Sequence, residues 1–195
     1  MPPVSSTAMT TDSLRQEISA LHKAEWTNWP HAYGRARDTP GHLTALLGDD
    51  PEAQLAAARH FGGAIVHQTS LWPASPDAFD WLIRVLRVSQ LPDDILAKSL
   101  GALAEAAEYL GETSDAVPEL SKEARNWLRR FARTSDDKHE HVWEQFFETE
   151  ASQEVWDWTL ARMATLRPAV LELAGALADR APKPCDDLRE AWQAK

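Results

Sequence analysis

A capping residue followed by proline and then by an apolar stripe recurs along residues 39–133 of the chain. A side-chain oxygen before a first-turn proline marks a helix start, because the oxygen accepts a hydrogen bond from a free backbone N–H and proline has no N–H to leave unpaired. Several such starts in close succession predict short helices that pack side by side. The starts with both residues are Thr39-Pro40, Asp50-Pro51 and Ser75-Pro76; Pro92-Asp93 and Pro118-Glu119 have the proline without the capping residue before it.

The apolar residues after these starts recur every three or four positions, which predicts helices. No stretch alternates polar and apolar residues over the length of a strand. Pairs of expected helices follow one another at about 35–45 residues, a spacing typical of two-helix repeats. We therefore predict an all-α fold, a short α-solenoid built as a right-handed stack of antiparallel helix pairs. The expected helices span residues 12–25, 40–48, 51–68, 76–88, 93–110, 118–133, 137–149, 152–165 and 168–180. The residues expected in the core are Leu55, Phe61, Phe79, Leu82, Leu96, Leu100 and Leu103.

The chain has 195 residues, of which 44% are hydrophobic, enough for one domain with a sizeable core. We expect a disordered N-terminus over residues 1–11, a single helical domain over 12–180, and a C-terminal tail of loop and short helix over 181–195. The only cysteine, Cys185, cannot form an intramolecular disulfide, which fits a reducing compartment. With neither a signal-peptide pattern nor a run of roughly 20 apolar residues, we expect a cytoplasmic protein without membrane contact.

The formal net charge of −10 bears on the class of partner. An acidic protein repels phosphate backbones and attracts basic surfaces. We therefore expect another protein with a basic surface as the partner, and no nucleic acid.

The segments Trp29–Leu47 (WPHAYGRARDTPGHLTALL), Asp49–Phe61 and Ile65–Gln68 resemble HEAT-like repeat proteins of bacteria, most of which have no assigned function. The resemblance covers about residues 26–110. It implies a right-handed α-solenoid whose concave face binds another macromolecule. It transfers no catalytic residue, because the repeat signature is structural.

The segment 26–38 is dense in aromatic, imidazole and carboxylate side chains, although Pro30 and Gly34 interrupt regular structure. These side chains can line a surface for a ligand or partner. Alternatively, the aromatic rings anchor the segment to the first helix and Asp38 caps the next one. Together with a second set near residue 70, the partner-binding candidates are Trp26, Trp29, His31, Tyr33, Asp38, His67, Gln68 and Trp72.

Histidines offer the main candidates for a metal site. His42, His60 and His67 could bind zinc if they converged, but their spacing does not enforce convergence. His139 and His141 are two positions apart, so on a helix they point about 200° from each other. Glu140, Glu144 and Glu148 share one helix face, which we interpret as an exposed acidic surface. We expect no metal and no cofactor.

Trp156, Asp157 and Trp158 suggest an alternative function. HEAT-like folds include the alkylpurine DNA glycosylases, which use aromatic rings and a carboxylate around a damaged base. By that resemblance the three residues are base-binding candidates, with phosphate contacts from Arg129, Arg130 and Arg133. Packing of an ordinary helix accounts for the same residues.

Two hypotheses follow from these observations. The first is a protein-binding helical-repeat module, for example an immunity or regulatory protein for a basic toxin or enzyme. The second is an enzyme on the same scaffold, either a DNA glycosylase or an enzyme with an aromatic-lined pocket for a small molecule. The sequence contains no nucleophile elbow, P-loop or dinucleotide-binding motif, so the first hypothesis is preferred.

Overall fold

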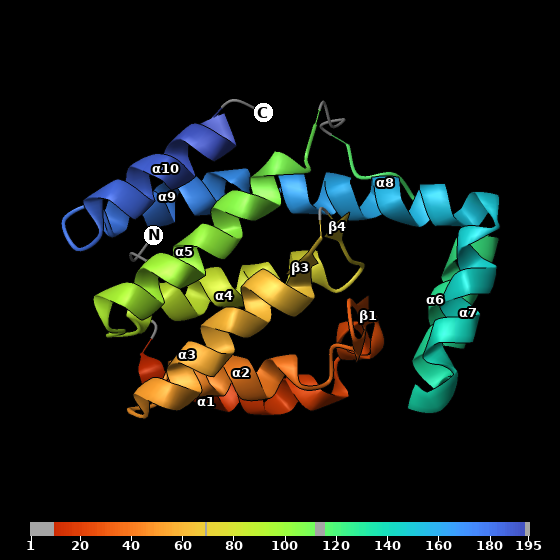
Figure 1. Cartoon of the computed structure of the whole chain (residues 1–195), viewed down its shortest axis with the longest axis horizontal. Coiled ribbons are helices and arrows are strands. Elements are labelled where there is room, and N and C mark those ends of the chain that lie inside the picture. Colours follow the sequence, from red (N-terminus) through yellow and green to blue (C-terminus); the bar gives the residue numbers. More distant parts are fainter. Residues whose placement is uncertain (1–9, 69, 112–115, 194–195) are drawn as a thin grey trace, which may run out of the picture.

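The computed structural model describes residues 10–68, 70–111 and 116–193, and these residues form a predominantly α-helical fold (Figure 1). The prediction of an all-α fold is therefore confirmed. The first half contains α1 (Thr11–Ala20), η1 (Leu21–Lys23), η2 (Glu25–Asn28), β1 (Pro30–His31), β2 (Gly34–Arg35), α2 (Thr39–Leu46), α3 (Pro51–His60), η3 (Phe61–Ile65), β3 (Val66–His67), β4 (Ser70–Leu71) and α4 (Ser75–Val88). The second half contains α5 (Asp93–Glu108), α6 (Lys122–Arg133), η4 (Asp136–Lys138), α7 (His139–Phe147), α8 (Glu150–Ala164), α9 (Arg167–Ala176) and α10 (Pro182–Gln193).

Proline lies in the first turn of α2, α3, α4 and α9. At α3 the expected cap is present, because the Asp50 carboxylate accepts a hydrogen bond of 3.0 Å from the Glu52 N–H. Ser75 acts differently. Its hydroxyl accepts from the Trp72 N–H and donates to the Ile65 carbonyl at 2.6 Å, so it fastens the β3–β4 segment to the start of α4.

The expected helix over residues 51–68 was wrong from Phe61 onward. α3 ends at His60, a π-helical turn covers Phe61–Ile65, and β3 pairs antiparallel with β4. Gly62 and Gly63 explain the break, because each glycine costs about 1 kcal/mol relative to alanine in a helix. Gln68 follows with φ of 44°, in the left-handed region.

The helices around the main core form two layers (Figure 1). In one layer α2 packs on α4 and α4 on α9; in the other, α3 packs on α5 and α5 on α10. Their apolar faces meet in a core that contains six of the residues expected there, all fully buried: Phe61, Phe79, Leu82, Leu96, Leu100 and Leu103.

Leu55, also expected in the core, is only half-buried. Gln54 is buried in its place, at 4% exposure, and donates to the Gly48 carbonyl at 2.7 Å. The inward face of α3 is therefore rotated by one position from the prediction. This arrangement satisfies a carbonyl in the turn between α2 and α3.

The structure places residues 182–193 in the main core instead of in a tail. Cys185, Leu188 and Trp192 recur at helical spacing along α10 and are all fully buried. The Trp192 Nε1–H donates to the Leu103 carbonyl at 2.8 Å. The helical domain therefore continues through α10.

A second, smaller core joins α6, α7 and α8. α8 leaves the main body beside α4, and the α6–α7 hairpin descends from its far end (Figure 1). A two-point ion pair fixes α8 to α4: Arg162 donates to both carboxylate oxygens of Asp77 at 2.8 and 2.9 Å. The second core contains Leu120, Ala124, Leu128, Phe146, Ala151 and Val155.

In the part of the chain that the structure describes, no helix is both long and apolar enough to cross a membrane.

Candidate functional site: a histidine–aspartate cluster beside a cleft

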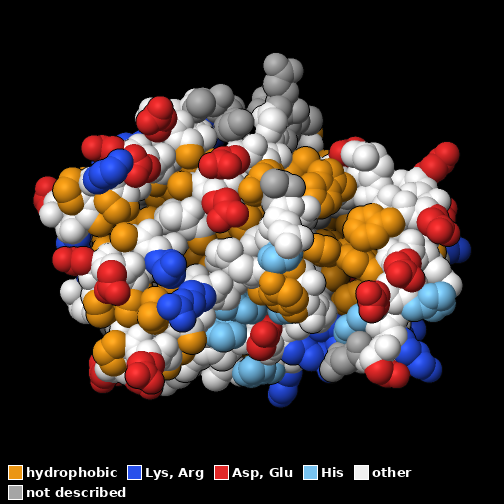
Figure 2. Space-filling model, in the orientation of Figure 1, with side chains coloured by type: hydrophobic (Ala, Val, Ile, Leu, Met, Phe, Trp, Pro, Cys, Tyr) orange, Lys and Arg blue, Asp and Glu red, His pale blue; other side chains and the backbone are white. Residues whose placement is uncertain are grey.

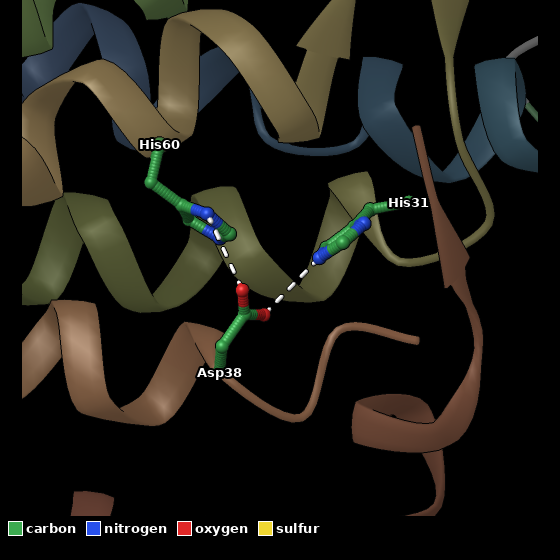
Figure 3. A group of neighbouring side chains, drawn as sticks. All are labelled: His31, Asp38 and His60. Atoms are coloured by element: carbon green, nitrogen blue, oxygen red, sulfur yellow. Dashed lines mark hydrogen bonds and ion pairs between the residues drawn. The ribbon is translucent and has the colours of Figure 1, made fainter. Parts of the chain in front are cut away.

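Three polar side chains from three elements meet beside the α2–α3 pair (Figure 3). His31 comes from β1, Asp38 immediately precedes α2, and His60 ends α3. His31 Nε2 lies 3.1 Å from Asp38 Oδ1, and His60 Nδ1 lies 3.9 Å from Asp38 Oδ2. One potential ligand atom from each residue lies within 4.8 Å of the other two.

The α2–α3 hairpin explains why these residues meet. Antiparallel helices joined by a short turn place the start of the first beside the end of the second. His42 follows Asp38 by one helical turn and joins the cluster. Its ring stacks on the ring of His60 with centroids 4.0 Å apart, and its Nε2 lies 3.9 Å from Asp38 Oδ2.

Both ring nitrogens of His31 are engaged. The Tyr33 N–H donates to Nδ1 at 3.1 Å, so the proton of the neutral ring must be on Nε2, from which it is donated to Asp38. Because neither nitrogen keeps a free lone pair, His31 is unsuited to accept a proton from a substrate. Its side chain is 4% exposed, so we interpret it as a clamp on the carboxylate.

The charges of the cluster follow from burial and proximity. The pKa of His60 is lowered to about 3, chiefly by burial and in addition by the nearby His42, while Asp38 partly opposes the shift. Burial also lowers the pKa of His42. For Asp38, burial opposes ionisation, but the hydrogen bond from His31 and the proximity of His60 outweigh it and lower the pKa. At neutral pH the cluster therefore consists of a carboxylate with neutral His42 and His60 beside it.

A cleft of about 620 Å³ begins at this cluster and separates the β1–β2 turn from the α6–α7 hairpin. His31, Tyr33 and Asp38 line one wall, and Phe131, His139 and Trp143 line the other. Figure 2 shows histidine side chains gathered on this face, next to a hydrophobic patch near the α6–α7 end. Arg35 Nη1 donates to the Ala132 carbonyl at 3.1 Å and so links the first wall to α6. Trp143 of the second wall stacks on Trp72, which lies outside the lining of the cleft, with centroids 5.4 Å apart.

His67 does not join His42 and His60. It lies on β3, where its Nδ1 is 3.3 Å from the Tyr33 hydroxyl and the two rings are 5.0 Å apart. Tyr33 is 71% exposed, and Gln68 is exposed beside His67. Of the three histidines considered for zinc, two converge and the third supports the tyrosine at the mouth of the cleft.

The tryptophan candidates occupy different environments. Trp26 is buried in the main core, at 8% exposure. Trp29 is half-buried and meets the edge of Trp158 at 5.2 Å between centroids. Trp72, also half-buried, stacks on Trp143 and lines a small apolar hollow with it. Of these three, Trp72 contacts Trp143, a residue of the cleft wall.

The base-binding candidates do not share a pocket. Trp156 lines a small apolar hollow with Leu71 and Phe147, whereas Trp158 faces Trp29 and the Arg162 guanidinium, 4.8 Å from its ring centroid. Asp157 is exposed and accepts a hydrogen bond of 2.7 Å from Gln153. Two aromatic faces do not converge on the Asp157 carboxylate.

The His139–His141 pair diverges as helical geometry predicts. His139 is buried, stacks on Phe131 at 4.4 Å between centroids, and lies with Nε2 2.9 Å from the Thr134 carbonyl oxygen. His141 is exposed on the opposite side of α7 and contacts Gln145.

Sequence analysis missed the role of His42 and His60 beside Asp38, although a signal was present. Asp38 lies twelve positions before Asp50 and His60 ten positions after it. In an antiparallel helix pair with its turn near Asp50, the two positions must lie opposite each other. The four-residue spacing of Asp38 and His42 then places both on the same helix face.

No family model, curated protein or solved structure matches the chain. The function is therefore inferred from the geometry of the cluster and the cleft.

Proposed function

We propose that the protein is a binding module that accepts a basic segment of another protein in the cleft beside α7. The observation that carries this proposal is the composition of one face of α7. Glu140, Trp143, Glu144 and Phe147 follow one another at positions i, i+3, i+4 and i+7 and therefore share a face. Both glutamates are exposed, and Phe147 is 57% exposed. Figure 2 shows acidic side chains bordering the hydrophobic patch in this region.

Alternating carboxylates and aromatic rings suit lysine and arginine side chains. Their aliphatic stems pack on rings, and their charged ends pair with carboxylates or lie over an aromatic face. Tyr33 supplies a further exposed ring on the opposite wall of the cleft. The net charge of −10 adds long-range attraction for a basic partner.

The rest of the fold supports the same role. We infer that α2–α3, α4–α5 and α9–α10 are successive pairs of a short HEAT-like stack, because their members alternate between the two layers. A solenoid of this kind presents a rigid surface to a macromolecular partner. Cys185 is free and buried, which is consistent with a role in a reducing cytoplasm. An immunity or regulatory protein for a basic toxin or enzyme is one concrete form of this function.

The test is selection of peptides from a random phage-displayed library against the purified protein. We expect selected peptides to be enriched in lysine and arginine flanked by apolar residues. The double variant Glu140→Lys/Glu144→Lys should lose this binding, as should Tyr33→Ala/Phe147→Ala, whose side chains are exposed and contribute little to folding. Glu190→Lys, an exposed reversal on α10 away from the cleft, is the matched control and should bind as the wild type does.

Three results would overturn the proposal. Selected peptides could lack an excess of basic residues, or both double variants could bind them unchanged. The third is binding of duplex oligonucleotides, plain or alkylated, at micromolar or tighter affinity that disappears when Arg129 and Arg130 are replaced. That result would support the DNA-directed alternative, since phosphate contacts by arginine weaken with salt and with loss of each cation.

A further inference from the structure

The two oxygens of the Asp38 carboxylate face different partners (Figure 3). Oδ1 accepts the hydrogen bond from His31. Oδ2 lies 3.9 Å from both His42 Nε2 and His60 Nδ1, which is longer than a hydrogen bond. We propose that Asp38 Oδ2, His42 Nε2 and His60 Nδ1 bind a divalent transition-metal ion of the zinc type. His31 then acts as a positioning residue that holds the carboxylate from outside the coordination shell.

The two separations from Asp38 Oδ2 to the histidine nitrogens are close to those of a metal site. With zinc–ligand distances of about 2.0–2.2 Å, ligand atoms in a tetrahedral shell lie roughly 3.3 Å apart. The observed 3.9 Å therefore requires a contraction of about half an ångström. The rings of His42 and His60 now stack with an interplanar angle of 19°, so one must turn for both nitrogens to aim at one ion. His42, at 30% exposure, has the freedom to turn, whereas His60 is held at 6% exposure.

The surrounding hydrogen bonds select the ligand atoms. Metal-bound histidine commonly donates its other ring N–H to a polar group, which orients the ring. His60 Nε2 lies 3.0 Å from the Thr39 hydroxyl oxygen and can donate to it, which leaves the Nδ1 lone pair facing Asp38. His31 lacks this arrangement. Its Nδ1 accepts from the Tyr33 N–H, so its Nε2 must keep the proton that it donates to Asp38.

The protonation states also suit a metal. Ligands must be neutral imidazole and ionised carboxylate. Burial lowers the pKa values of His60 and His42, and the His31 hydrogen bond helps to keep that of Asp38 low, so binding at neutral pH displaces few protons. Two imidazole nitrogens and one carboxylate oxygen favour zinc and its neighbours over magnesium or calcium, which prefer oxygen ligands. Asp38 is 54% exposed, so a fourth coordination position faces solvent.

The test is titration of the full chain, first stripped with EDTA, with Zn²⁺ at neutral pH in an isothermal calorimeter. We expect one ion per chain. His42→Ala and His60→Gln should each weaken binding by more than about 100-fold, because each removes a ligand. His31→Gln should weaken it by about 10–100-fold, as loss of an orienting partner does. His22→Ala, an exposed histidine on η1, is the matched control and should leave the affinity unchanged. Circular dichroism of each variant shows whether it is folded.

Co²⁺ supplies a second measurement. Its visible absorption reports nitrogen and oxygen ligands in a four-coordinate shell, and it should change in His42→Ala even though that partly exposed replacement leaves the fold intact. Absence of stoichiometric Zn²⁺ binding by the wild type would overturn the proposal. So would wild-type affinity in His42→Ala, or a loss in His31→Gln equal to that in His60→Gln.

Discussion

Replacement of His60 by glutamine should make the protein less sensitive to acid. In the folded state burial lowers the pKa of His60 from 6.5 to about 3. Between these two values the unfolded chain holds a proton on His60 that the folded protein does not. Since acid then favours the state that binds the proton, stability is lost as pH falls from about 6.5 towards 3 and is regained as pH rises.

The size of the effect follows from the two pKa values. Each pH unit in which only the unfolded state is protonated changes the free energy of unfolding by about 1.4 kcal/mol. Between pH 7 and pH 5 the contribution of His60 amounts to about 2 kcal/mol, because most of the change falls below pH 6.5. In His60→Gln this contribution is absent, while the side-chain amide can still donate to Thr39 as the ring does at 3.0 Å.

Urea unfolding followed by tryptophan fluorescence measures the difference. Both proteins are unfolded at pH 7 and pH 5 with EDTA present, so that metal binding does not contribute. The fall in unfolding free energy should be about 2 kcal/mol smaller in His60→Gln than in the wild type. His22→Gln, at an exposed position, should behave as the wild type does. A difference below about 0.5 kcal/mol would refute the argument that His60 is kept neutral by burial.

Two further predictions concern the main core. Leu82→Ala, at a fully buried position of α4, should lower the unfolding free energy by about 2–5 kcal/mol without changing the denaturant slope; a loss within about 0.5 kcal/mol in urea unfolding would contradict the packing. Trp192→Phe keeps an aromatic ring but removes the hydrogen bond to the Leu103 carbonyl, and should cost about 1–2 kcal/mol in the same assay. An unchanged stability in Trp192→Phe would mean that α10 is not anchored through this contact.

Local sequence signals predicted the helices well where they act within a few residues. Proline in the first turn correctly marked the beginnings of α2, α3 and α4, because its effect needs no distant partner. The start expected at Pro118 was wrong, since α6 begins at Lys122 and its N-cap is Ser121. The end of α3 was missed although Gly62 and Gly63 gave a local signal for it, whereas the β3–β4 pairing that follows depends on contacts made by residues up to Leu71. α10 was underestimated for a related reason: its burial depends on α5 and α9, which lie far away in sequence.

The site was predictable only in part. The segment 26–38 was recognised from its composition, and it does supply His31, Tyr33 and Asp38 to the cleft. The face of α7 was recognised as acidic, but its aromatic residues were not connected with the wall opposite. That connection depends on where α8 carries the hairpin, and no spacing within the sequence encodes this position.

The separate core of the α6–α7–α8 region has a consequence for amide hydrogen exchange. Because Leu120, Leu128, Phe146 and Val155 pack among themselves and not in the main core, the hairpin forms a cooperative unit that can open while the rest stays folded. Amides in Lys122–Arg133 and His139–Phe147 therefore exchange through a sub-global opening, which requires less free energy than the opening that exposes the amides of α4 or α5. The same opening parts Trp143 from Trp72, so the width of the cleft and the protection of these amides vary together.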